Sequence, residues 1–402
     1  MIVLRNRVIA AAFALGFIVA NSVLGVANVF AEIQPQMVLR IVPGHSVATE
    51  FLSAQYLSKG LRDSRRRRQF RNLAMTAHQA DPTYAGSLRN FAQIAAIEDR
   101  QIEARKLYRL AFQFSRRDLL TTLNMIDIAA RSGDASGALN YYDVAMRSAP
   151  AARPMLMPSL ANGFKEPELH KHFVALAKTN PPWFEQFSLW MVERKINEEP
   201  LAELIIASKN SRLAHNEELL RNLIHTLVNE ERLELAMELY RSFHQSSLNH
   251  QFVDVSFRDG KRLPPFDWSI ASTNGIAEGF GARISGARLE YWSNGGAGLL
   301  GQKMLLMKPG KYRLDVWQQS PNHALAEIET VLVCPKRAND IARLTIVKSA
   351  ASVDFIVPSD CPTQWINVFF NRRISEYGNV EIRGYFWPRI FKLIETEPPP
   401  EL

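Results

Sequence analysis

The sequence has few of the residues and motifs by which enzymes are usually recognised. Only 2 of its 402 residues are cysteine and 9 are histidine, and the histidines do not form the helical two-histidine-plus-glutamate pattern of zinc hydrolases. It also lacks a phosphate-binding loop, a dinucleotide fingerprint and a nucleophile-elbow serine. Gly279 and Gly281 flank one phenylalanine without a helix to cap a phosphate, and the spacing of Glu327 and Glu329 is common on solvated strands. We therefore expect no catalytic residue, no metal site and no cofactor.

The bulk composition indicates a folded, basic protein. Its 47% hydrophobic and 22% charged residues suffice to bury sizeable cores, and its length predicts two globular domains after a short N-terminal segment. The formal net charge of +8 favours acidic partners, which include nucleic acid, anionic lipid headgroups and acidic polysaccharide. Charge alone does not choose among the three.

An uncharged, largely apolar run occupies residues 8–31, directly after Arg5 and Arg7. At about 1.5 Å per helical residue, this run matches a bilayer core of ~30 Å. By the positive-inside rule, residues 1–7 form a cytoplasmic stub and the bulk of the chain lies in the periplasm, as in a single-pass inner-membrane protein. Val29-Phe30-Ala31 also resembles a signal cleavage site, so secretion to the periplasm after cleavage is the alternative. A buried core helix is the third interpretation.

A repeat of 34 residues relates residues 85–118 to residues 119–152. It aligns four pairs of positions: Ala95 with Ala129, Ala104 with Ala138, Tyr108 with Tyr142, and Ala111 with Ala145. Alanine at such sites lets two helices approach closely, and the aromatic side chain fills the groove between successive hairpins. A further unit is readable at residues 217–243, whereas prolines make residues 153–210 irregular.

These positions resemble the tetratricopeptide repeat, in which an aromatic residue follows the small residue of the second helix by four positions. The resemblance implies a helical solenoid, which we place at residues 32–250. It also implies a binding surface for protein partners and a scaffolding role.

After His250 the hydrophobic pattern becomes alternating and turn residues become frequent. Ten strands are expected, at residues 252–257, 268–271, 287–292, 299–307, 311–318, 326–334, 342–347, 352–357, 364–370 and 380–386. Short strands at this spacing fit an antiparallel β-sandwich. The run 299–317, with its Pro309-Gly310 turn, resembles the jelly rolls of carbohydrate-binding modules and galactose-binding-like domains. This resemblance implies a fold and does not by itself imply a sugar ligand.

Both cysteines, Cys334 and Cys361, lie in this β region, and each precedes a proline. A disulfide between them would suit an oxidising periplasm and would contribute roughly 3 kcal/mol by closing a loop of about 26 residues. Two free cysteines in the core are the alternative.

Six arginines crowd a short stretch of the helical region: Arg62, Arg65, Arg66, Arg67, Arg68 and Arg71. A solvated helix face, contact with anionic lipid or acidic polysaccharide, and nucleic-acid binding are the three interpretations. Export disfavours nucleic acid, and no nucleic-acid motif is present.

Three aromatic residues are expected on strand faces opposite the core: Trp292, Trp317 and Tyr385. Such rings could stack on sugars or contact a partner, and packing under a loop or at a domain interface is the other interpretation.

The sequence thus predicts a multidomain, α-then-β chain with a transmembrane helix, a helical solenoid and a jelly-roll domain. The expected divisions are 1–7, 8–31, 32–250 and 251–390, followed by a proline-rich tail at 391–402. The function that we expect is non-catalytic binding or scaffolding in the bacterial envelope, accessory to surface polysaccharide assembly or export. A protein scaffold without glycan contact and a carbohydrate-active enzyme with an unrecognised site are the alternatives.

Overall fold

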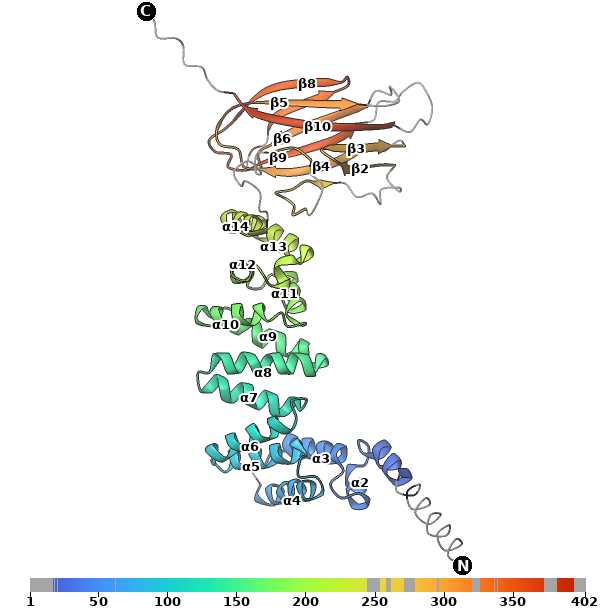
Figure 1. The fold of residues 1–402 in the computed structure, drawn as a ribbon, viewed down its shortest axis with the longest axis vertical. Helices are drawn as coiled ribbons and strands as arrows, with labels where there is room; N and C mark the ends of the chain where they lie inside the picture. The colour runs from blue at the N-terminus through green and yellow to red at the C-terminus, as the bar shows by residue number, and fades with distance from the viewer. Residues whose placement is uncertain are drawn as a thin grey trace, which may run out of the picture. The chain divides into compact units, whose positions relative to one another are not determined.

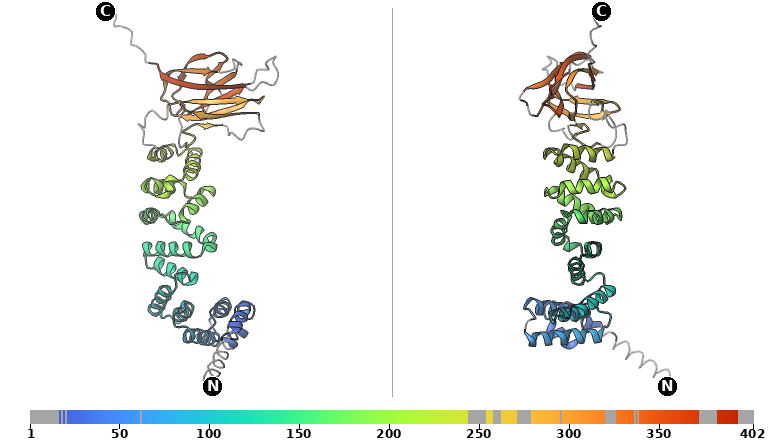
Figure 2. Two further views of the ribbon diagram at one scale, coloured as in Figure 1. Left: turned by 45° about the vertical axis from the view of Figure 1, so that its right-hand side comes forward. Right: turned by 90° about the vertical axis from the view of Figure 1, so that its left-hand side faces the viewer.

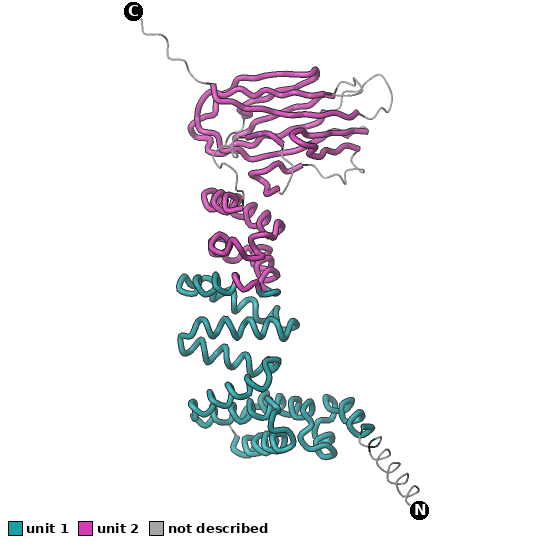
Figure 3. Tube along the Cα trace, in the orientation of Figure 1, with its two compact units in different colours: residues 1–176, 181–183 teal, residues 177–180, 184–402 magenta. Residues whose placement is uncertain are grey.

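The structure is a computed structural model. It describes residues 17, 19, 21–61, 63–243, 254–257, 262–270, 279–294, 296–319, 326–335, 337, 339–371 and 382–393. Helices come first and strands follow, as the sequence predicts (Figure 1). The chain divides into two compact units, residues 1–176 with 181–183 and residues 177–180 with 184–402 (Figure 3). The predicted domain boundary at 250/251 lies outside the described residues.

Residues 21–30 are helical and are followed by a series of short helices. These are α2 (Pro35–Ile41), α3 (Ser46–Ser58), α4 (Ser64–Ala80), α5 (Ala85–Ile97), α6 (Gln101–Phe114), α7 (Leu119–Arg131), α8 (Ala135–Ser148), α9 (Arg153–Phe164), α10 (Pro167–Lys178), α11 (Phe184–Glu193), α12 (Glu198–Ala207), α13 (Glu217–Asn229) and α14 (Leu233–Phe243). No helix among the described residues has both the length and the apolar character needed to cross a membrane. Of the predicted membrane segment 8–31, residues 8–16, 18 and 20 lie outside the described part.

The 34-residue period is visible in the helix bounds themselves. Helices α7 and α8 begin and end 34 residues after α5 and α6, respectively. Ala95, Ala104 and Ala111 are buried where α5 and α6 meet their neighbours, and Tyr108 is buried beside them. The repeat is therefore a real structural unit, while its membership of the tetratricopeptide family stays a prediction.

Four helical hairpins turn in the same way. In each turn one residue just after the first helix has a left-handed backbone: Asp99 (φ 60°), Gly133 (φ 73°), Lys195 (φ 53°) and Glu231 (φ 60°). The α11–α12 turn has a second one, Asn197 (φ 59°). In each of the four turns, the residue after the first left-handed one donates its N–H to the carbonyl five residues earlier: Arg100 to Ala95 (2.8 Å), Asp134 to Ala129 (2.9 Å), Ile196 to Met191 (2.9 Å) and Arg232 to Leu227 (2.8 Å). This is the Schellman arrangement that ends a helix. The hairpin pattern therefore includes α11 and α12, which lie within the proline-rich stretch 153–210 that was predicted to be irregular.

Among the described residues, ten strands form two antiparallel sheets that pack as two layers (Figure 2). They are β1 (Ser269–Ile270), β2 (Phe280–Ser285), β3 (Arg288–Ser293), β4 (Gly298–Leu305), β5 (Gly310–Gln319), β6 (Glu327–Val333), β7 (Asp340–Ile346), β8 (Ala350–Val357), β9 (Gln364–Asn371) and β10 (Ile382–Lys392). One sheet has the order β1-β4-β9-β6-β7 and the other β2-β3-β10-β5-β8. Alternating side chains from both sheets meet in one core, for example Leu314 and Phe386 from one and Ile328 and Val368 from the other. The predicted β-sandwich is confirmed.

One expected strand was wrong, and one strand of the structure was missed. Residues 254–257 of the strand expected at 252–257 are not in a strand, and residues 252 and 253 lie outside the described part. Val255 and Phe257 alternate because both enter the core, where the Trp268 indole N–H donates to the Val255 carbonyl (3.1 Å). Conversely, β2 was missed because its glycine suggested a turn.

Candidate functional site

Two indole rings lie side by side on one sheet of the sandwich. Tyr312, Leu314 and Val316 of β5 point into the core, so alternation places Trp317 on the opposite face. The strand pairing sets Trp317 directly across from Trp387 of β10. Their ring planes are nearly parallel, at 12°, with centroids 6.4 Å apart. A pair of half-buried aromatic rings of this kind offers an apolar platform on the outer face of the sheet.

The neighbours of the two rings differ. The Arg288 guanidinium lies over the Trp387 ring, 4.5 Å from its centroid, in a cation–π contact. On the other side of the pair, the strand partner of Trp317 is Ala350 of β8. The small alanine side chain leaves the Trp317 side of the platform less covered than the Trp387 side.

The platform borders a cleft of about 1200 Å³ in the second unit. Trp317 and Trp387 line it together with four cationic side chains and one carboxylate: Arg241, Lys308, Arg389, Lys392 and Asp254. Two of these, Arg389 and Lys392, follow Trp387 on β10 and are exposed. The lining therefore combines aromatic rings with a formal excess of positive charge, which suits a ligand that has apolar ring faces and acidic groups.

The structure brings only one of the three predicted aromatic residues to this cleft. Trp292 on β3 packs over Gly281 of β2, where the Cβ of any larger residue would come within 2.6 Å of the indole. Tyr385 lies on β10 between Glu290 of β3 and Gln319 of β5. Both are half-buried on the predicted face, and neither lines the cleft.

Trp387 was missed by sequence reasoning. The strand was expected at residues 380–386, which leaves out Trp387 and also Pro388, a residue that lacks the N–H of a strand ladder. In the structure, the described pairing of β10 with β3 ends at Phe386, whereas its pairing with β5 runs on to Lys392. At Pro388, β10 therefore has a described strand partner on one side only. A proline is tolerated there because its backbone nitrogen, which lacks an N–H, can face the unpaired side.

The predicted arginine patch lies at the beginning of α4, except for Arg62, which is outside the described residues. Arg66 donates to the Lys59 carbonyl (2.9 Å), and Arg71 pairs with Glu98 (2.5 Å). No ion pair is seen for the Arg65, Arg67 and Arg68 side chains within the described part of the chain. Positive charge at a helix N-terminus opposes the helix dipole, so these side chains do not stabilise α4.

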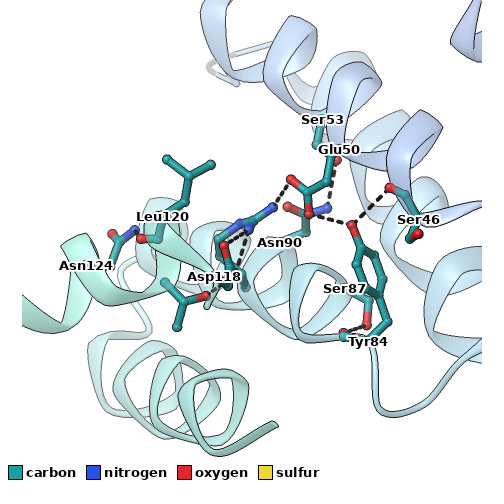
Figure 4. Close-up of polar contacts among 11 residues, drawn as sticks. Ser46, Glu50, Ser53, Tyr84, Ser87, Asn90, Asp118, Leu120 and Asn124 are labelled. Atoms are coloured by element: carbon teal, nitrogen blue, oxygen red, sulfur yellow. Dashed lines mark hydrogen bonds and ion pairs between the residues drawn. The ribbon is translucent and has the colours of Figure 1, made fainter. Parts of the chain in front are cut away.

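A buried charge network lies nearby in the first unit (Figure 4). Arg89 of α5 is 1% exposed; its guanidinium donates to both carboxylate oxygens of Asp118 (2.6 and 2.7 Å) and to Glu50 (2.5 Å). Tyr84 donates to Glu50 as well (2.5 Å), and burial raises the Tyr84 pKa well above its ordinary value. Each partner comes from a different segment, so the network connects α3, α5 and the start of α7. We assign it a structural role because both carboxylates are engaged by Arg89.

A second groove, of about 840 Å³, runs between α7–α8 and α9–α10 in the first unit. Small and apolar residues such as Ala138, Leu139 and Leu160 line it, together with Tyr142 and His170. The Tyr142 and Ser159 hydroxyls hydrogen-bond across it (2.9 Å). The repeat position Tyr142 thus faces a concave surface and is not fully buried.

The two cysteines form the predicted disulfide, Cys334–Cys361, with Cα atoms 5.9 Å apart. It joins the end of β6 to the loop before β9, beside the buried Gln364 amide, which donates to the Cys361 carbonyl (2.6 Å). No group of three or more histidine, cysteine, aspartate or glutamate side chains able to hold a metal occurs among the described residues.

Comparisons with known proteins give distant similarities only. No protein-family model matches the chain, and no curated protein matches it. Among solved structures, the chain is similar to one described as "CBM4 structure and function" (12% identity, TM-score 0.25, 37% of this chain and 100% of the other). It is also similar to a carbohydrate-binding module, TmCBM61, in complex with beta-1,4-galactotriose (10%, 0.21, 31% and 82%). A third is a structure of accessory secretory proteins 1, 2 and 3 of Streptococcus pneumoniae (10%, 0.23, 35% and 97%). Similarities at this level carry no functional conclusion about this chain.

Proposed function

We propose that this chain is a non-catalytic, membrane-tethered binding protein of the bacterial envelope, which holds an acidic polysaccharide in the cleft of its sandwich. The role would be accessory to assembly or export of that polysaccharide. The observation that carries the proposal is the parallel pair Trp317 and Trp387 in a cleft whose charged lining is mostly cationic. Sugar rings stack on aromatic faces, and carboxylate or phosphate substituents pair with Lys and Arg.

The composition of the cleft also supports binding over catalysis. Glycoside hydrolysis usually needs two carboxyl groups on either side of the scissile bond. Among the described residues that line the cleft, Asp254 is the single carboxylate. A carbohydrate-active enzyme is therefore the weaker alternative for this site.

Binding of soluble polysaccharides by the full chain, measured by calorimetry, tests the proposal. Trp317→Ala and Trp387→Ala should each weaken binding of an acidic polysaccharide by about five-fold, since one aromatic contact contributes about 1 kcal/mol. Arg389→Ala should weaken the binding of acidic polysaccharides and leave that of neutral ones unchanged.

Trp292→Ala is the matched control, because Trp292 lies on the same sheet face but outside the cleft. Equal losses in the Trp292 and Trp317 variants would contradict a specific site. Binding of acidic polysaccharide that is insensitive to both Trp317→Ala and Trp387→Ala would refute the proposal.

A protein scaffold without glycan contact is the second candidate, and the groove beside Tyr142 favours it. A photo-crosslinker placed at Ala138 in cells should then capture a protein partner. A crosslinker at Ile102, which is exposed on α6 outside that groove, serves as the control.

A further inference from the structure

Exposed apolar side chains concentrate at the beginning of the described chain. Among the described residues 21 large hydrophobic side chains are exposed, and 12 of them lie between Phe17 and Phe51. Scattered exposed hydrophobic residues are ordinary on a soluble surface, but a contiguous group of this size marks an interaction surface.

The helix at residues 21–30 exposes apolar side chains over more than half of its circumference. Val23, Leu24, Val26, Val29 and Phe30 are all exposed, and at 100° per residue they cover an arc of about 220°. Asn21 and Asn28 lie on the remaining side, and Ala27 is buried against the helices that follow. A protein partner or a second copy would cover a narrower stripe of such a helix, whereas lipid can cover the whole exposed arc. In sequence, the helix also continues the uncharged run that begins at residue 8.

The apolar surface does not end where that uncharged run ends. Ile33, Met37 and Ile41 follow it at four-residue spacing and are 71%, 41% and 59% exposed. A small groove of about 240 Å³ joins Met37 and Ile41 to Val26 and Phe30, and its lining is almost wholly apolar. We call these five residues, Val26, Phe30, Ile33, Met37 and Ile41, the N-terminal apolar surface.

Polar residues accompany this surface, as they do in segments that lie at a membrane interface. Glu32, Gln34, Gln36 and Arg40 are exposed among the apolar side chains. The opposite side of α2 is occupied, since Pro35 and Val38 are buried, and Val38 packs in a cluster with Ala27, Ala31 and Ala48. Such an element can lie in the plane of the headgroups with its apolar side chains towards the acyl chains.

We infer that α2 is an interfacial element, so that the lipid contact extends beyond residue 31 to Ile41 and seats the first helical unit on the bilayer surface. This inference rests on the proposed membrane tether. It places lipid contacts on Ile33, Met37 and Ile41, which lie after the uncharged run at residues 8–31.

Depth-dependent fluorescence quenching tests the inference with the full chain in anionic phospholipid vesicles. Single cysteines replace Val26, Met37, Ile41 or Ile102, and each carries an environment-sensitive dye, while the native disulfide keeps Cys334 and Cys361 unlabelled. We expect lipids with a nitroxide at the headgroup boundary to quench labels at Met37 and Ile41. Lipids with a nitroxide deep in the acyl chain should quench the label at Val26. Ile102 is 76% exposed on α6 and should be quenched by neither lipid.

The outcomes separate the inference from the tether. Quenching at Val26 without quenching at Met37 and Ile41 would overturn the interfacial role of α2 and leave the tether standing. Blue-shifted emission at Met37 and Ile41 that no lipid quencher affects would mean that protein covers them, which also overturns the inference. Absence of quenching at all four positions would overturn both proposals.

Discussion

Arg89 shows how a single charged side chain determines the packing of three helical segments. Removing a charge from water is costly unless partners compensate, and here Glu50 and Asp118 both accept hydrogen bonds from the guanidinium. No pattern in the sequence predicted this arrangement, because Arg89 lies 39 residues from Glu50 and 29 from Asp118. Buried charge networks form through tertiary contact, so local patterns do not reveal them.

Tyr108 permits a test of burial at one residue. Desolvation raises the pKa of this repeat tyrosine to about 12, a rise that the nearby Arg89 charge opposes and that of Asp127 favours. The folded state therefore holds the Tyr108 proton more tightly than the unfolded state, in which the pKa is about 10. Its contribution to stability is complete below pH ~10 and is lost as pH rises towards ~12.

We expect Tyr108→Phe to flatten the alkaline fall in the free energy of unfolding by up to about 1.4 kcal/mol per pH unit. Urea unfolding of the parent and the variant between pH ~9 and ~12 measures this difference. Burial also raises the pKa values of Tyr84 and Tyr291. Both tyrosines are present in the parent and in the variant, so the difference between the two pH slopes reports Tyr108. Identical pH slopes in parent and variant would show that Tyr108 ionises without a change in stability.

Among helices and strands, the predictable part was the part with strong local periodicity. The spacing of alanines placed α5 to α8 correctly, and the alternation in residues 311–318 identified β5. The hairpin of α11 and α12 was hidden because the prolines within residues 153–210 made that stretch look irregular. The strand at 280–285 was hidden because Gly281, which makes room for Trp292, suggested a turn.

The left-handed residue of each hairpin turn offers a prediction about these elements. A side chain in this conformation costs roughly 1 kcal/mol, which glycine avoids. We expect Lys195→Gly to stabilise the chain by up to about 1 kcal/mol, and Gly133→Ala to destabilise it by a similar amount. A Cβ at Gly133 would meet no atom within 4 Å, so that loss would report the backbone alone.

Glu193→Gly is the matched control for Lys195→Gly. Glu193 is an exposed charged residue at the end of α11, where the backbone is helical, so glycine should cost about 1 kcal/mol there. Urea midpoints with unchanged slopes give both values. A loss of stability in Lys195→Gly equal to that in Glu193→Gly would show that the left-handed turn carries no strain.

At the scale of the whole molecule, the structure bears on whether residues 8–31 could be removed as a signal peptide. Ala27 and Ala31 are 5% and 0% exposed in a cluster with Val38 of α2 and Ala48 of α3. The Asn28 carboxamide oxygen also lies 3.1 Å from the His45 ring nitrogen. The end of the apolar run is thus packed against the helices that follow it.

Cleavage after Ala31 would remove half of this cluster and uncover Val38 and Ala48, each of which is now fully or almost fully buried. We therefore expect the mature protein to retain its N-terminal segment. Intact-mass measurement of the chain recovered from bacterial membranes checks this, with a secreted protein of known cleavage site processed in the same cells as the control. A mature chain that begins at Glu32 would contradict the expectation. In such a chain Val38 and Ala48 would lose their contacts with Ala27 and Ala31, and other apolar side chains would have to pack against them.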